Sequence, residues 1–274
     1  MKRNLIKRSL ILASLLLSLG LLATRCGGKG DKQIPEPVVT DNSRVEIPPP
    51  VVPVPNHNVK PLDLGIAQSF AAMAYSSIIS DPTSTIRGKV GLKPGTRSLI
   101  ALDAKTEVEG GSDNIYSGDD LGDKAVYLTL AREDLISAYR EAAARPTDKD
   151  KVEAFQGNIG AKILPPGIYK WSNGLIVDSD VTLEGNKKDV WIFQITGDVV
   201  VASGVRFKLL DGARPGNIYW QVSGKVTLEA NTKVPGTIMS QLTFEMKNSA
   251  KLTGRALVKN GKLLMNQNTI EVPN

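Results

Sequence analysis

Three carboxylates near the middle of the chain have the spacing best suited to acid–base chemistry. Asp178 and Asp180 are two residues apart, so they can share one face of a strand, and Glu184 can join them. Paired carboxylates of this kind act as acid and base in glycoside hydrolysis. Because no other residues complete such a site, we expect these three to be charges at a corner of the fold.

A single histidine and a single cysteine restrict the remaining chemistry. His57 lies in a proline-rich segment and is expected to be a solvated linker residue, so a Ser/His/Asp triad is not predicted. A zinc cluster lacks its ligands, and the Asp-containing stretch 103–124 does not follow the spacing of a calcium loop. The glycines form no phosphate loop or dinucleotide fingerprint. The sequence therefore predicts a protein that is not an enzyme and uses no metal or cofactor.

The positive net charge of +6 is concentrated at the N-terminus. Residues 1–25 contain five of the 34 basic residues and no acidic residue, which leaves 29 basic and 28 acidic residues in the rest of the chain. A nearly neutral mature chain has no broad attraction for phosphate, so we expect no nucleic-acid partner.

Residues 1–25 have the layout of a signal peptide, with a basic start and an apolar run over 10–22 that is short for a membrane span. Cys26 follows directly and resembles the lipid-modified cysteine of bacterial lipoproteins, although Arg25 replaces the small residue usual before it. We expect an exported protein, either a lipoprotein of the outer membrane or cell surface or a secreted protein, with any membrane contact made through lipid on Cys26.

Residues 26–61 are rich in proline and show no apolar period, which is typical of an extended tether. The folded domain is expected to cover 62–274. With 41% hydrophobic but only 5% aromatic residues, its composition favours stacked β layers filled by aliphatic side chains.

Short apolar triplets recur mostly every eighteen or nineteen residues between Val181 and Val272, which is the period of a β-solenoid. The outer two residues of each triplet can point into a core, while the middle one points to solvent. This first column comprises Val181-Thr-Leu183, Val199-Val-Val201, Val226-Thr-Leu228, Phe244-Glu-Met246 and Leu263-Leu-Met265.

A second column of strands is apolar on both faces, as expected for strands that are buried from two sides. It comprises 190–195, 217–222, 236–240 and 254–258. One amphipathic helix of roughly fifteen residues begins near Ala125, has Leu128, Leu130 and Leu135 on its apolar stripe, and is stopped by Arg145-Pro146. Because its single apolar stripe needs a surface, we expect the helix to lie along the second column.

Eight fragments in sequence order resemble the microbial ice-binding protein family over residues 62–272. They are Leu64-Gly-Ile-Ala-Gln-Ser-Phe-Ala71, Ile86-Arg-Gly-Lys-Val-Gly-Leu-Lys-Pro-Gly95, Asp134-Leu-Ile-Ser-Ala-Tyr-Arg-Glu-Ala-Ala-Ala-Arg145, Leu164-Pro-Pro-Gly-Ile-Tyr-Lys170, Val190-Trp-Ile-Phe-Gln-Ile195, Asn217-Ile-Tyr-Trp-Gln-Val222, Pro235-Gly-Thr-Ile238 and Gly254-Arg-Ala-Leu257. The resemblance implies a mainly β fold: a right-handed, discontinuously wound β-solenoid of triangular section with one long α-helix packed along a face. In some members an exposed flat face adsorbs to ice.

The outward positions of the first column are the predicted ice-binding surface of a monomer. The candidates are Thr182, Val200, Thr227, Thr243 and Leu264. Charged neighbours hold their own hydration shells and should disturb such a surface. The alternative is therefore a cell-surface adhesion module that binds a surface polymer, a glycan or a protein through the same solenoid.

Overall fold

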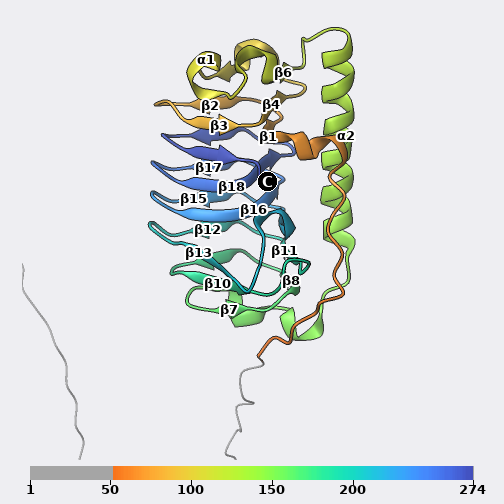
Figure 1. Ribbon diagram of the computed structural model, residues 1–274, viewed down its shortest axis with the longest axis vertical. Coiled ribbons are helices and arrows are strands. Elements are labelled where there is room, and N and C mark those ends of the chain that lie inside the picture. Colours follow the sequence, from red (N-terminus) through yellow and green to blue (C-terminus); the bar gives the residue numbers. More distant parts are fainter. Residues whose placement is uncertain (1–51, 274) are drawn as a thin grey trace, which may run out of the picture. The chain divides into compact units, whose positions relative to one another are not determined.

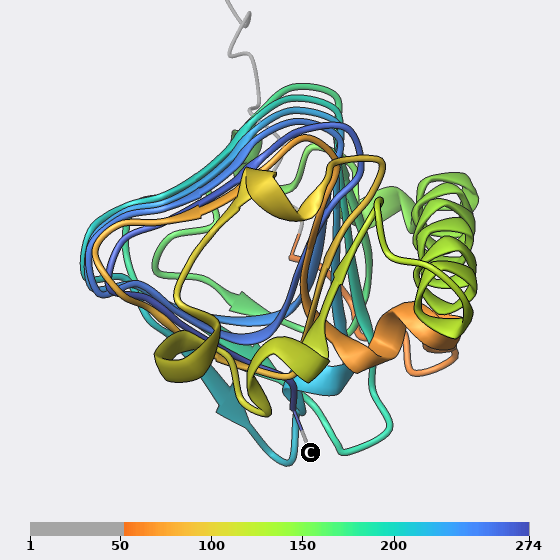
Figure 2. The ribbon, with the colours of Figure 1, turned by 90° about the horizontal axis from the view of Figure 1, so that it is seen from above.

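Each coil of the structure contains short strands on three faces, and strands of successive coils pair in parallel. The computed structural model describes residues 52–273. Viewed along the stack, the coils superimpose as a triangle with a helix outside one side (Figure 2). The predicted signal peptide, Cys26 and the tether up to residue 51 lie outside the described residues.

Face A lies beneath the long helix (Figures 1 and 2). From the bottom coil to the top coil, its strands are β8 (Gly167–Trp171), β11 (Trp191–Ile195), β14 (Ile218–Val222), β16 (Lys233–Ser240), β18 (Lys251–Val258), β1 (Phe70–Ala74), β4 (Lys89–Leu92) and β6 (Ile115–Ser117). These strands include the predicted second column, which is buried on both faces as expected.

Faces B and C complete the triangle. Face B contains β9 (Leu175–Val177), β12 (Val199–Val201), β15 (Val226–Leu228), β17 (Phe244–Met246), β19 (Leu263–Met265), β2 (Ile78–Ser80) and β5 (Ile100–Ala101). Face C contains β7 (Ile163–Leu164), β10 (Val181–Glu184), β13 (Phe207–Leu210), the first residues of β16 and β18, then β20 (Thr269–Glu271) and β3 (Thr85–Arg87).

The winding is discontinuous, because the N-terminal strands lie on top of the C-terminal ones. β1 pairs with β18, β2 with β19 and β3 with β20. The chain therefore begins its upper coils before α1 (Ala104–Glu107), returns to the bottom through α2 (Asp123–Ala144), and then climbs from β7 to β20. The repeat in the sequence predicted the solenoid over 181–272, and residues 64–95 were expected to form its first strands; the structure adds 163–177 and places the N-terminal strands on top of the C-terminal ones.

Two glycines allow β16 and β18 to bend from face C onto face A. Gly236 has a positive φ of 104°, and a Cβ on Gly254 would meet the carbonyl oxygen of Gly236 at 1.8 Å. Because the two backbones touch at this corner, only residues without a side chain fit there.

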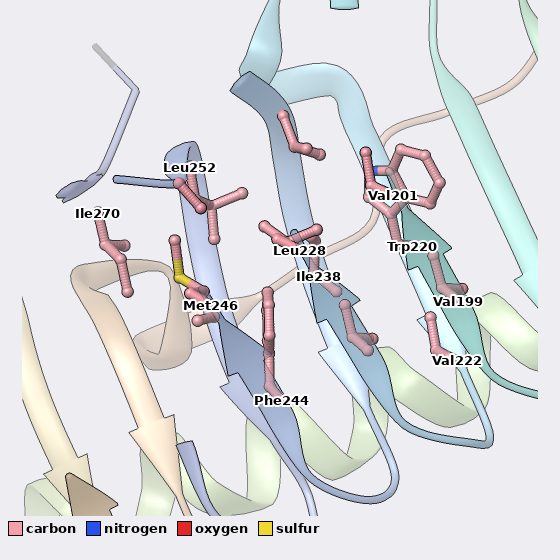
Figure 3. Packing of buried hydrophobic residues seen from close by; sticks show 14 of the residues in the cluster. Val199, Val201, Trp220, Val222, Leu228, Ile238, Phe244, Met246, Leu252 and Ile270 are labelled. Carbon is pink, nitrogen blue, oxygen red and sulfur yellow. The ribbon is translucent and has the colours of Figure 1, made fainter. Parts of the chain in front are cut away.

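The core is filled by the inward residues of all three faces (Figure 3). All three tryptophans are buried in its lower half, although composition favoured an aliphatic core. Each indole donates a hydrogen bond to a backbone carbonyl: Trp171 to Ala154, Trp191 to Leu164 and Trp220 to Pro235, at 2.9 to 3.1 Å. Such partners remove the cost of burying the indole N–H.

Helix α2 is longer than the predicted fifteen residues, and its buried stripe agrees with the predicted one except at Leu130. Its 22 residues include buried Leu128 and Leu135, but the predicted Leu130 is 43% exposed. Buried Arg132 fills the sheet-facing side instead and donates to the carbonyl oxygens of Val258 and Lys259. A polar residue with partners on the sheet thus occupies a place that an apolar pattern cannot reveal. The predicted stop at Arg145-Pro146 is confirmed.

Among residues 52–273, no helix combines the length and hydrophobicity needed to cross a bilayer.

The described end of the predicted tether, residues 52–61, contacts the lower coils rather than extending freely. Lys151 is only 1% exposed, and its ammonium lies 3.3 Å from Asp148 and donates to the carbonyl of Val54. The side chain of His57 is 58% exposed, as expected for a solvated residue, but its imidazole Nδ1 lies 2.8 Å from the buried carboxylate of Asp189 and so attaches the segment to the fold. The segment 52–64, called the strap below, then runs beside α2 towards β1 (Figure 1).

We predict that Leu135→Ala lowers the free energy of unfolding by about 2 to 5 kcal/mol, because it removes apolar volume between α2 and face A. Leu130→Ala, on the same helix but exposed, should change it by less than about 1 kcal/mol. Urea unfolding followed by circular dichroism measures both. Equal losses would mean that Leu130 also faces the sheet.

Candidate functional site

The outward side of face B carries one central residue from each strand, and these residues form a single ladder. The pairing of the strands sets them side by side in register. From bottom to top the ladder reads Ile176, Val200, Thr227, Glu245, Leu264, Ile79 and Ala101. Neighbouring strands in such a sheet are spaced about 4.8 Å apart.

Six of these seven side chains end in methyl groups, and several are well exposed. Ile176 is 54% exposed, Val200 39% and Ile79 37%. A row of exposed aliphatic side chains is unusual on a soluble protein and indicates a surface that meets a partner. The exception is Glu245, whose carboxylate pairs with the ammonium of Lys247, so its charge is balanced locally.

Backbone hydrogen bonds also join the corners that precede the face B strands. The amide of Val199 donates to the carbonyl of Lys225, that of Val226 to Thr243 and that of Phe244 to Lys262, at 2.8 to 3.0 Å. These bonds extend the backbone pairing of the sheet by one residue beyond the strands. The residues on either side of each central position are buried in the core. The backbone that carries the ladder is therefore fixed by the packed core on its inner side and by the hydrogen bonds at the corners.

The predicted site residues separate into two groups. Val200, Thr227 and Leu264 lie on the ladder, as predicted. Thr243 lies at the corner directly before β17, half-buried, and contributes its backbone carbonyl to that corner.

Thr182 is not part of this face, so its placement in the first column was wrong. Its strand, β10, pairs with β7 and β13 on face C. The strand that continues the ladder below Val200 is β9. The eighteen-residue step from Val181 to Val199 spans a turn from one face to another, and equal spacing cannot distinguish that from a full coil.

Sequence reasoning missed Ile176, Ile79 and Ala101. The triplet Leu175-Ile-Val177 has the same alternation as its neighbours and could have been found by pattern. The other two belong to the N-terminal coils, and their place above Leu264 depends on the discontinuous winding. Local sequence contains no signal for that order.

Charged residues border the ladder on both sides, and Glu245 is the one charged residue within it. On one side the corners contain exposed Asp198, Lys225 and Lys262. On the other side lie Asp178 and Lys247. The face is thus a narrow apolar strip between polar margins.

Of the three carboxylates considered for catalysis, Asp178 and Asp180 lie at the corner between faces B and C, whereas Glu184 is the last residue of β10, at the other end of that strand. The side-chain amide of Asn158 donates to Asp178, and the backbone amide of Arg206 donates to Asp180; each bond holds the pKa of its carboxyl below the usual value. Lys208 lies 3.5 Å from Asp180. A general acid needs a raised pKa, so these groups suit a charged corner rather than proton donation.

The described part of the chain contains no cluster of side chains of the kind that holds a metal ion. Across residues 52–273, no group of three or more His, Cys, Asp or Glu side chains is arranged to hold a metal ion.

Comparison with known proteins places this geometry in a family. The family model described as ice-binding-like matches residues 72–271. An ice-binding protein from Flavobacterium frigoris (strain PS1) is 37% identical over 217 residues, which cover 77% of this chain and 76% of the relative. An ice-binding protein from a Colwellia species is 34% identical and covers 77% and 84% of the two chains.

Solved structures agree with the sequence relatives. The crystal structure of a glycosylated ice-binding protein from an Arctic yeast superposes with a TM-score of 0.73 at 31% identity, covering 78% of this chain and 94% of that one. An ice-binding protein from an Antarctic biological consortium gives a TM-score of 0.71 at 33% identity, covering 82% and 96%. With a model that spans most of the solenoid, relatives above 30% identity and the same architecture, the chain belongs to the ice-binding-like family.

Proposed function

We propose that this protein adsorbs to ice through face B and thereby inhibits ice growth or recrystallisation. The observation that carries the proposal is the ladder from Ile176 to Ala101, in which six methyl-bearing side chains repeat in register on a rigid parallel sheet. The names of the relatives and of the solved structures supply independent support, since each is an ice-binding protein.

The chemistry of the ladder suits a solid water surface. Methyl groups restrict the orientation of neighbouring water without binding it strongly, so an ordered layer can form along the row. The hydroxyl of Thr227 can hydrogen-bond into this layer at the middle of the face. A regular spacing between rungs repeats the same arrangement from coil to coil. Once the protein is adsorbed, it prevents further water molecules from joining the ice on the area that it covers.

Charges set the limits of the adsorbing strip. A carboxylate or ammonium keeps its own hydration shell, because removing a charge from water is costly. The pair Glu245 and Lys247 reduces this disturbance at the one charged rung, since each side chain partly satisfies the other. Adsorption therefore uses the centre of the face rather than its charged margins.

The protein acts without catalysis in this proposal, as a monomer whose partner is the ice surface. It is exported and held at the outer membrane or cell surface through lipid on Cys26, or alternatively it is secreted. The described chain begins beside the lower coils, where Lys151 and Asp150 contact Val54.

Substitution on the ladder tests the proposal directly. The purified protein should show thermal hysteresis and inhibit recrystallisation. Thr227→Tyr should lose most of both activities, because a bulky side chain lifts the face from the ice while the inward neighbours Val226 and Leu228 stay packed. The measurements are nanolitre osmometry and a recrystallisation assay.

Thr182→Tyr is the matched control, because Thr182 is the half-buried outward residue of a face C strand. It should retain the activity of the unmodified protein. Equal loss in both variants, or loss only in Thr182→Tyr, would move the site away from face B. Absence of both activities in the unmodified protein at high micromolar concentration would reject ice adsorption and favour the adhesion module.

Metabolic labelling with an acyl analogue tests the anchor. Wild-type protein expressed with its own leader should incorporate label and fractionate with membranes, because a thiol is the attachment point for lipid in bacterial lipoproteins. Cys26→Ala should incorporate none. Equal labelling of the two proteins, or none in either, would leave secretion as the mode of export.

A further inference from the structure

A break in face C creates a cleft where β13 leaves β16. The two strands are joined by a single parallel bridge, Arg206 to Lys233. Two residues later β16 contains Pro235, which has no amide hydrogen to continue the ladder. β13 therefore diverges from the stack, and the chain crosses a loop and the short helix at Pro215–Asn217 before it returns to face A (Figure 2).

The floor of this cleft is apolar and includes an accessible aromatic ring. The cavity has a volume of about 270 Å³ and is lined by Phe207, Leu209, Pro215, Val234 and Pro235. Phe207 is half-buried and packs edge-on against buried Trp220, with 5.6 Å between ring centroids. The ring is thus fixed in orientation and offers a firm platform.

Two lysines stand together at the rim. Lys233 and Lys251 are direct partners on adjacent parallel strands, both are exposed, and both line the cleft. Neither forms an ion pair within the described residues, whereas Lys208 on β13 is paired with Asp180. Like charges on neighbouring positions of a sheet destabilise it. An anionic ligand would reverse that effect.

The cleft continues along face C beyond the lysines. Thr253 lines both the cleft and a second cavity of about 510 Å³, which is bordered by Arg87, Glu109 and Glu271. Thr253, Glu271 and Arg87 are register partners on successive strands, so the two cavities follow the axis of the stack. Because Arg87 is paired with Glu271 in the second cavity, the positive charge offered to an anionic ligand lies at the lysine end, and the part of a polymer beyond Thr253 would meet the cavity through its hydroxyl groups.

We propose that the face C cleft binds an acidic polysaccharide, with sugar rings over Phe207 and Pro235 and carboxylates at Lys233 and Lys251. The C–H faces of a pyranose suit an aromatic and proline floor, the hydroxyl of Thr253 suits sugar hydroxyls, and ammonium groups form strong bonds with carboxylates. A peptide strand added to the sheet edge is less suitable. Pro235 lacks a donor, and its carbonyl already accepts from Trp220.

Calorimetric titration of the purified protein with three polymers tests this site. The probes are an oligomer of galacturonate, a neutral galactose oligomer of equal length, and poly-glutamate, all at one fixed salt concentration. Binding is expected for the galacturonate oligomer alone. The double variant Lys233→Gln with Lys251→Gln should weaken it about tenfold or more, and Thr253→Tyr, which fills the junction of the two cavities without changing charge, should also weaken it.

The matched control is Lys105→Gln with Lys149→Gln, which removes the same charge at α1 and at the short helix Lys149–Lys151. It should bind as the unmodified protein does, and all variants should keep the thermal hysteresis of the unmodified protein if they are folded. Equal weakening in both double variants would reduce the effect to net charge and overturn the site. Binding of poly-glutamate in preference to galacturonate would assign the cleft to acidic peptides, and binding of neither would also overturn the proposal.

Discussion

Helix α2 has to carry the chain from the top coil back to the bottom coil, and most of the architecture depends on how it does so. Its 22 residues span about 33 Å at 1.5 Å per residue. The eight strands of face A beneath it are separated by seven steps of about 4.8 Å, which is nearly the same length. Because one straight helix covers the whole height, the N-terminal coils can lie above the C-terminal ones without a long loop.

This return path also decides which surface remains free. Buried Leu128 and Leu135 pack on face A, and the strap with Leu62 and Leu64 joins the same apolar cluster. Face A is therefore covered along its height and unavailable to a large partner. Among residues 52–273, no long helix covers face B as α2 covers face A, and the proposed adsorption to ice gives its exposed aliphatic ladder a role.

Much of this architecture could be predicted from sequence, because repeats and periodicity are local. The triplets around Val200, Thr227 and Leu264 predicted their own orientation, since in-out-in alternation depends only on the strand. The prediction for Thr182 was wrong because equal spacing in the sequence was assumed to place residues on the same face of the solenoid. Ile79 could not be placed at all: its neighbour Leu264 is far along the chain, and only the discontinuous winding joins them.

The break at Pro235 shows that one face of a solenoid can be irregular while another face stays regular. Among the face B strands from β9 to β19, the longest step, from Val199 to Val226, contains the whole excursion of β13 and the helix at 215–217. Yet Val200 and Thr227 remain register partners, because the extra residues are accommodated on face C. Regularity on face B thus tolerates an irregular face C, and the chain can carry a repeating surface, which we propose adsorbs to ice, beside a cleft of different chemistry.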